Sequence, residues 1–80
     1  MIRIAKQTRL KSEEVIIKAV KFFGKAGAHL QEKERTACCV SFEGSGGYVA
    51  ISVIEENKLR TVDVETREFE YQASRFIQML

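Results

Sequence analysis

Three successive segments in the middle of the chain alternate apolar and polar residues, and this alternation constrains the fold more than any other feature. The segments span residues 36–43, 48–54 and 59–65. A period of two is typical of strands that bury one face, because successive side chains point to opposite sides of a sheet. Short links separate the segments, one rich in glycine and the other containing Asn57. The sequence therefore predicts a meander of three antiparallel strands.

Two further segments are candidates for strands in the same sheet. Residues 2–5 alternate as well, and we expect Ile2 and Ile4 to face the core. Residues 28–33 are polar apart from Ala28 and Leu30, so this segment is compatible either with a short strand that points Leu30 inward or with a loop.

The first helix is predicted by apolar residues between 15 and 26 that recur at helical spacing. Ser12 stands where an N-cap is expected, and the following glutamates suit the positive end of the helix dipole. The lysines of this segment fall on the opposite side and are expected to face water. Gly24 and Gly27 are expected to end the helix, because glycine tolerates the left-handed conformation that commonly closes one.

The second helix is predicted at the end of the sequence. Thr66 is the expected cap. The apolar residues Phe69, Ala73, Phe76 and Leu80 recur at i, i+4, i+7 and i+11, which places them on one face. We expect this helix to run to the last residue and to cover the sheet with that face.

These elements predict one α+β domain over residues 1–80 with two layers: a curved antiparallel sheet of four to five strands and two helices on one face. The 80 residues, 45% of them hydrophobic and 30% charged, suit one small packed core. The order strand, helix, two to four strands, helix resembles one half of the TATA-box-binding protein fold. A fold-level resemblance implies no function.

Two runs in the second half of the chain resemble a family of small uncharacterised prokaryotic proteins. The first is Phe42-Glu43-Gly44 followed by Gly46-Gly47-Tyr48-Val49, and the second is Glu65-Thr66-Arg67-Glu68-Phe69 followed by Tyr71-Gln72. The resemblance covers about the C-terminal half and implies no known activity.

The sequence favours a cytoplasmic protein without a cofactor, a metal or a membrane segment. No apolar run approaches the ~20 residues that span a bilayer, and no secretory signal is recognisable at the start. The two cysteines, Cys38 and Cys39, are adjacent, which rules out a long-range disulfide framework. If both lie in a strand, their side chains should diverge, with Cys38 in the core and Cys39 on the open face. Only His29 could join them, and three ligands are too few for a structural zinc site.

The leading functional hypothesis is a non-catalytic module that binds a protein or a ligand. The sheet face away from the helices should combine small residues with a few apolar ones, and Cys39, Tyr48, Ile54 and Leu59 are its candidate contact residues. Self-association could use that face or an unpaired sheet edge. A plain water-exposed sheet face is the alternative explanation of the same residues.

Two other hypotheses stay open. Residues 1–25 hold seven cationic side chains against two glutamates, and a nucleic-acid-binding domain would use Arg3, Arg9, Lys18, Lys21 and Lys25. Lysines on a solvated helix face explain the same pattern, and the open face lacks a stacking platform of aromatic residues. A small thiol enzyme built on Cys39 and His29 is the weakest alternative. The glycine-rich run 44–47 does not suit a phosphate loop, because a strand follows it instead of a helix.

Overall fold

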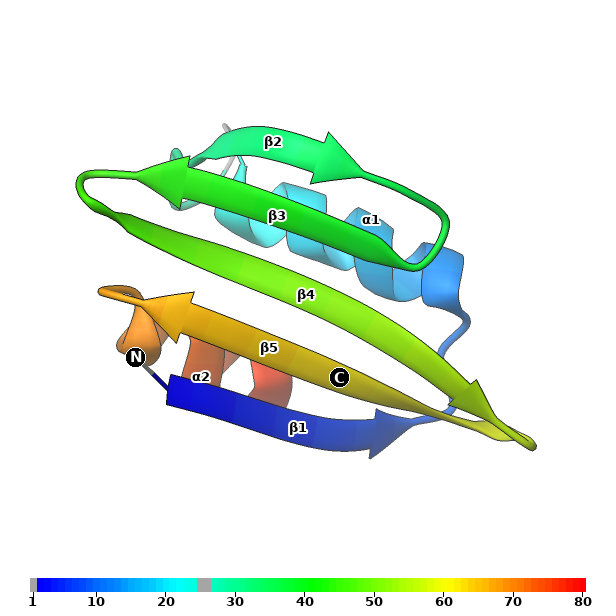
Figure 1. Ribbon diagram of the computed structural model, residues 1–80. Helices are drawn as coiled ribbons and strands as arrows, with labels where there is room; N and C mark the ends of the chain where they lie inside the picture. Colours follow the sequence, from blue (N-terminus) through cyan, green and yellow to red (C-terminus); the bar gives the residue numbers. More distant parts are fainter. Residues whose placement is uncertain (1, 25–26) are drawn as a thin grey trace.

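The computed structural model of the protein describes residues 2–24 and 27–80. They form one five-stranded antiparallel sheet and two helices. In chain order the elements are β1 (Ile2–Thr8), α1 (Ser12–Phe23), β2 (Gln31–Arg35), β3 (Cys39–Gly44), β4 (Gly47–Glu56), β5 (Leu59–Arg67) and α2 (Glu70–Gln78). The strand order is β1-β5-β4-β3-β2, so that β1 and β2 are the two edges (Figure 1).

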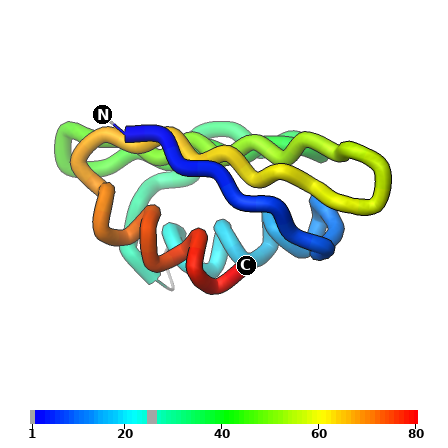
Figure 2. The backbone as a smooth tube through the Cα atoms, turned by 90° about the horizontal axis from the view of Figure 1, so that it is seen from below, coloured from blue at the N-terminus to red at the C-terminus, as the bar shows by residue number. Residues whose placement is uncertain are grey.

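The sheet is one layer and the two helices are the other (Figure 2). Helix α1 contacts β3 and β4, whereas α2 contacts β1 and β5, so together they cover one face of the sheet. The opposite face carries neither helix and is turned towards the viewer in Figure 1. The predicted two-layer α+β fold is confirmed.

The core lies between the layers and is built around four phenylalanines. The Phe23 ring lies 5.6 Å from that of Phe42 and 5.3 Å from that of Phe76, and Phe22 lies 5.8 Å from Phe76. Strand residues of one parity complete the core: Val40, Val49, Ile51, Val53, Val62 and Val64. The period of two seen in the sequence therefore identifies the buried face correctly.

The first helix differs from the prediction at both ends. Its N-cap is Lys11, whose backbone N–H donates to Glu14 Oε1 at 3.2 Å. Ser12 is the first helical residue, and its hydroxyl instead donates to Glu55 Oε1 on β4, which ties the start of the helix to the sheet. At the other end Gly24 is extended, with φ −79°, rather than left-handed. Its N–H still donates to the Val20 carbonyl, so a helical bond extends to the cap residue.

The segment between α1 and β3 also differs from the prediction. A strand does form there, but it spans Gln31–Arg35, and the buried Leu30 precedes it. Strand β3 begins only at Cys39, because residues 36–38 make the turn from β2. The turn exposes Cys38, so its predicted core position is wrong. The two cysteines are joined by a disulfide instead of diverging on opposite faces of a strand.

The cap predicted for the last helix is wrong as well. Thr66 belongs to β5 and is fully buried, and its hydroxyl donates to the Tyr48 carbonyl on β4 at 2.8 Å. Helix α2 starts at Glu70 after an N-cap at Phe69 and ends at Gln78, two residues before the last one. The predicted packing face is confirmed: Ala73 and Phe76 are buried, and Phe69 and Leu80 pack against the core.

Candidate interaction surface

The sheet face away from the helices is here named the open face. Strand register brings residues from all five strands into rows across it. One row runs without a gap from edge to edge: Arg3, Glu65, Ala50, Ser41 and Glu34. The rows on either side are Arg67, Tyr48, Glu43 and Gln31, and Ala5, Asp63, Ser52 and Cys39.

Small side chains occupy the middle of the open face. Ala50 and Ser52 lie on the central strand β4, with Ser41 beside Ala50 on β3 and Ala5 beside Asp63 on β1. They leave a shallow depression of about 190 Å³ over β3 and β4. A second, wider depression of about 470 Å³ lies over β1 and β5, where Ile54 forms part of its wall. The face is therefore hollowed on both sides of β4.

A polar network organises the β1–β5 side of this face. Arg3 Nε lies 3.0 Å from Asp63 Oδ2, and Arg3 Nη2 lies 3.9 Å from Glu65 Oε1. The Tyr48 hydroxyl donates to Glu65 Oε2 at 2.7 Å. This hydrogen bond, more than partial burial or the Glu65 charge, raises the pKa of Tyr48 above its ordinary value. Arg3 is 68% exposed and retains donors for a partner, because a guanidinium carries five N–H groups.

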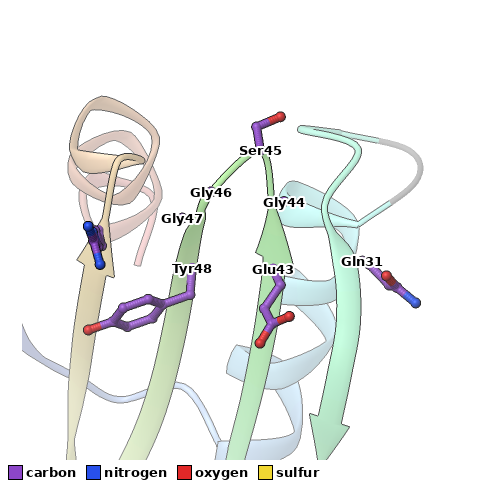
Figure 3. Close-up of a pocket in the computed structure, with 8 residues that line it drawn as sticks. Gln31, Glu43, Gly44, Ser45, Gly46, Gly47 and Tyr48 are labelled. Carbon is purple, nitrogen blue, oxygen red and sulfur yellow. The ribbon is translucent and has the colours of Figure 1, made fainter.

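A pocket of about 400 Å³ opens at the end of the β3–β4 hairpin (Figure 3). Gly44–Gly47 form its rim, and Gln31, Glu43, Tyr48 and Arg67 complete the lining. In Figure 3 the Tyr48 ring extends from β4 towards β5, while the Glu43 carboxylate stands over β3. Lys33 Nζ lies 3.8 Å from Glu43 Oε2, so acidic and basic groups share this end of the open face.

The four contact residues predicted from the sequence all lie on the open face. Tyr48 and Ile54 are on β4, Leu59 is on β5, and Cys39 begins β3. Ile54 is 52% exposed, whereas Leu59 and Cys39 are half-buried. Cys39 is also held in the disulfide with Cys38.

The four predicted contact residues did not include the charged members of the same face. Arg3, Asp63, Glu65 and Arg67 join the candidate residues through the β1–β5 and β4–β5 registers. The alternation in residues 59–65 places Asp63 and Glu65 on this face, but no sequence signal brings β1 next to β5. Pairing between strands so far apart in the chain is decided by how the helices and the sheet pack together, and not by a local sequence pattern.

The residues proposed for nucleic-acid binding do not form one surface. Arg3 is on the open face, paired with Asp63. Lys18 and Lys21 are on α1 in the other layer. Arg9 is in the connection between β1 and α1, and its carbonyl accepts a 3.4 Å hydrogen bond from Arg60. Lys25 lies outside the described residues.

The residues proposed for a thiol enzyme are separated. His29 is exposed and stands two residues before Gln31, which pairs with Glu43 near the end of β3. Cys39 is at the start of β3 and, as a disulfide sulfur, provides no thiolate in this structure. Within residues 2–24 and 27–80, no three His, Cys, Asp or Glu side chains gather where they could hold a metal ion.

The helical layer also exposes large apolar side chains, but singly. Ile17 on α1 is 54% exposed, and Tyr71 and Met79 near the two ends of α2 are 70% and 52% exposed. Scattered exposed apolar residues are normal on a protein surface. In the part of the chain that the structure describes, neither helix is long and apolar enough to cross a membrane.

No family model and no curated protein matches this chain.

Proposed function

We propose that this chain is a non-catalytic binding module whose contact surface for a protein partner is the open face. The observation that carries the proposal is the edge-to-edge row of Arg3, Glu65, Ala50, Ser41 and Glu34, which has small side chains in the middle and charged ones at both ends. Interfaces combine a closely packed centre with a polar rim, and this row has that arrangement.

The fixed positions of the polar groups support the same proposal. Arg3, Asp63, Glu65 and Tyr48 are held by contacts between 2.7 and 3.9 Å before any partner arrives. Groups that are already ordered lose less conformational entropy on binding than free side chains do. A partner would meet a surface whose hydrogen-bonding groups are already oriented.

The sheet edges are poorer contact surfaces than the open face. All five residues of β2 are exposed, four of them are charged, and the register shifts between Glu32 and Glu34. Strand β1 carries Arg3 on the open face and Lys6 on the other. Charged side chains and bulges on edge strands oppose the addition of a further strand.

The proposal can be tested by site-specific photo-crosslinking in the cells that make the protein. A photoreactive amino acid replaces Ile54 in one version and Ile17 in the other, because the two isoleucines are almost equally exposed on opposite layers. We expect a crosslinked product of defined mass from position 54 and none of that mass from position 17. Products that are absent, or the same from both positions, would contradict the proposal.

A further inference from the structure

The charges of the open face are distributed asymmetrically about β4. Its cations on one side are Arg67 and Arg3, on β5 and β1. On the other side, β3 and β2 carry the carboxylates of Glu43 and Glu34, and the Lys33 ammonium lies 3.8 Å from Glu43. Tyr48, Ala50, Ser52 and Ile54 form the column between them along β4. Arg67 and Glu43 lie at equivalent positions on the two sides of β4, and so do Arg3 and Glu34. A surface with opposite charges at such positions can be complementary to a second copy of itself.

From this arrangement we infer that the partner of the open face is a second copy of the chain, docked face to face about a two-fold axis that runs along β4. The inference rests on the proposed function and names the occupant of the same surface. The axis lays β1 of one copy over β2 of the other, and β5 over β3. Arg3 then faces Glu34 of the second copy and Arg67 faces Glu43, while Asp63 and Glu65 face the uncharged Cys39 and Ser41.

The other face-to-face arrangement of two copies is unfavourable. A two-fold axis that lies in the interface and runs across the strands places each strand over the same strand of the second copy. With the axis between Asp63 and Glu65, each of these acids meets the other one on the second β5. With the axis through the Glu65 row, Asp63 meets Arg67, but Glu65 meets Glu65 and Arg3 meets Arg3. Like charges that face each other across an interface cost free energy. Electrostatics therefore selects the axis along β4.

The shape of the surface suits the selected axis. Two sheets pack about 10 Å apart and within roughly 30° of parallel when their facing side chains interdigitate. Ala50 and Ser52 on the axis allow this approach. Ile54 is 52% exposed on the same column and would be covered by the second copy. The depressions on either side of β4 would receive the side chains of the opposite sheet.

The size of the face limits the strength of the dimer. Five strands span roughly 19 Å across, and a ten-residue strand is roughly 33 Å long. Complete coverage therefore buries on the order of 600 Å² per copy, below the ~800 Å² per partner of standard stable interfaces. The dimer should be reversible, with a dissociation constant on the order of micromolar.

Sedimentation velocity over a concentration series tests this inference with the full purified chain. The parent protein should shift from monomer to dimer as its concentration rises through the micromolar range. Ile54→Lys, which puts two ammonium groups together on the axis, should stay monomeric at least 10-fold higher in concentration, whereas its matched control Ile17→Lys should behave as the parent. Circular dichroism confirms that each variant is folded.

A charge variant gives a second, independent readout. Glu34→Lys places a cation opposite Arg3 of the second copy, so its dimer should be weaker than the parent's at low salt and should recover as salt screens the repulsion. Glu13→Lys adds the same charge to α1 and should leave the dimer unchanged.

A parent protein that stays monomeric throughout, or a dimer that Ile54→Lys does not weaken more than Ile17→Lys does, overturns the inference. If position 54 still crosslinks to a different protein in cells, the open face remains a binding surface whose partner is not a second copy.

Discussion

Tyr48 is tied to two successive residues of β5, one on each face of the sheet. Its hydroxyl donates to Glu65 on the open face at 2.7 Å, and its carbonyl accepts from the Thr66 hydroxyl at 2.8 Å on the core side. Directly opposite Tyr48 in the ladder is Arg67, so Glu65 is its diagonal neighbour. These contacts fix the end of the β4–β5 pair where the candidate interaction surface meets the β3–β4 hairpin.

The Tyr48–Glu65 bond predicts a shifted titration. The carboxylate stabilises the neutral phenol, which raises the pKa of Tyr48 above 10.0. The bond therefore stabilises the fold fully below pH 10.0, and its contribution is lost as pH rises through the higher pKa of the folded state. In a Tyr71→Phe background, Tyr48 is the remaining tyrosine, so tyrosinate absorbance reports its titration alone.

Adding Glu65→Gln to that background should move the titration of Tyr48 down towards its ordinary pKa. Glu43→Gln is the matched control, because Glu43 is the cross-strand neighbour of Tyr48 on β3, whereas the hydrogen bond that raises the Tyr48 pKa comes from Glu65. Equal effects of the two substitutions would show that the Glu65 hydrogen bond is not the cause.

Thr66→Val should destabilise the protein by about 1 kcal/mol, the net contribution of a typical buried hydrogen bond. Thr66 is 0% exposed, and valine has nearly the same shape, so the change removes the bond to the Tyr48 carbonyl without opening a cavity. Urea unfolding followed by circular dichroism measures the effect. Thr61→Val, on the same strand but half-exposed, should change the free energy of unfolding by much less. An equal loss of unfolding free energy in both variants would show that the hydrogen bond between Thr66 and Tyr48 is not the cause.

Gly46→Ala should cost about 1 kcal/mol through the backbone alone. Gly46 has φ +81°, and a Cβ there would meet nothing within 4 Å, so no clash contributes. With Ser45 at φ +44°, it makes the two-residue turn between Gly44 and Gly47. Gly46→Asn should cost less, because asparagine tolerates the left-handed region. Urea unfolding separates the two variants, and an alanine variant as stable as the asparagine one would contradict this reasoning.

The sequence predicts the features that depend on residues close together in the chain better than those that depend on residues far apart in it. Local periodicity predicts the strand meander, the two amphipathic helices and the parity of the open face, because a buried face imposes its period on the residues that form it. Thr66 shows where this reasoning fails. Its position before an apolar helical pattern is typical of a cap, but Thr66 pairs with Val49 and Arg67 pairs with Tyr48, so β5 extends beyond it.

The ion pair between β1 and β5 in the candidate site was beyond sequence reasoning for the same cause, although periodicity does place Asp63 and Glu65 on the open face. Arg3 and Asp63 are sixty residues apart in the sequence and meet at 3.0 Å only because β1 pairs with β5. The prediction for the two cysteines fails for a different reason. Residues 36–43 read as one strand, which would separate the two side chains, whereas the turn through Thr36 and Cys38 brings the sulfurs together.

The cysteine pair yields a prediction about chemical reactivity. Under non-reducing conditions a thiol-alkylating reagent should leave the native protein unmodified, because both sulfurs are in the disulfide. After treatment with a dithiol reductant, mass spectrometry should show the addition of two alkyl groups. Since adjacent residues close the shortest possible loop, the bond constrains the unfolded chain little. Reduction should therefore change the free energy of unfolding by only about 1 kcal/mol.

Cys38→Ser provides the control for that experiment. Cys38 is exposed in the β2–β3 turn, so the substitution should leave the circular dichroism spectrum unchanged. It should also release Cys39 as a free thiol that adds one alkyl group without any reductant. Two additions to the unreduced parent protein would mean that the disulfide does not form in solution. Unfolding on reduction would mean that the turn is held by the disulfide rather than by the Thr36 N–H, which donates to the Cys39 carbonyl at 2.8 Å.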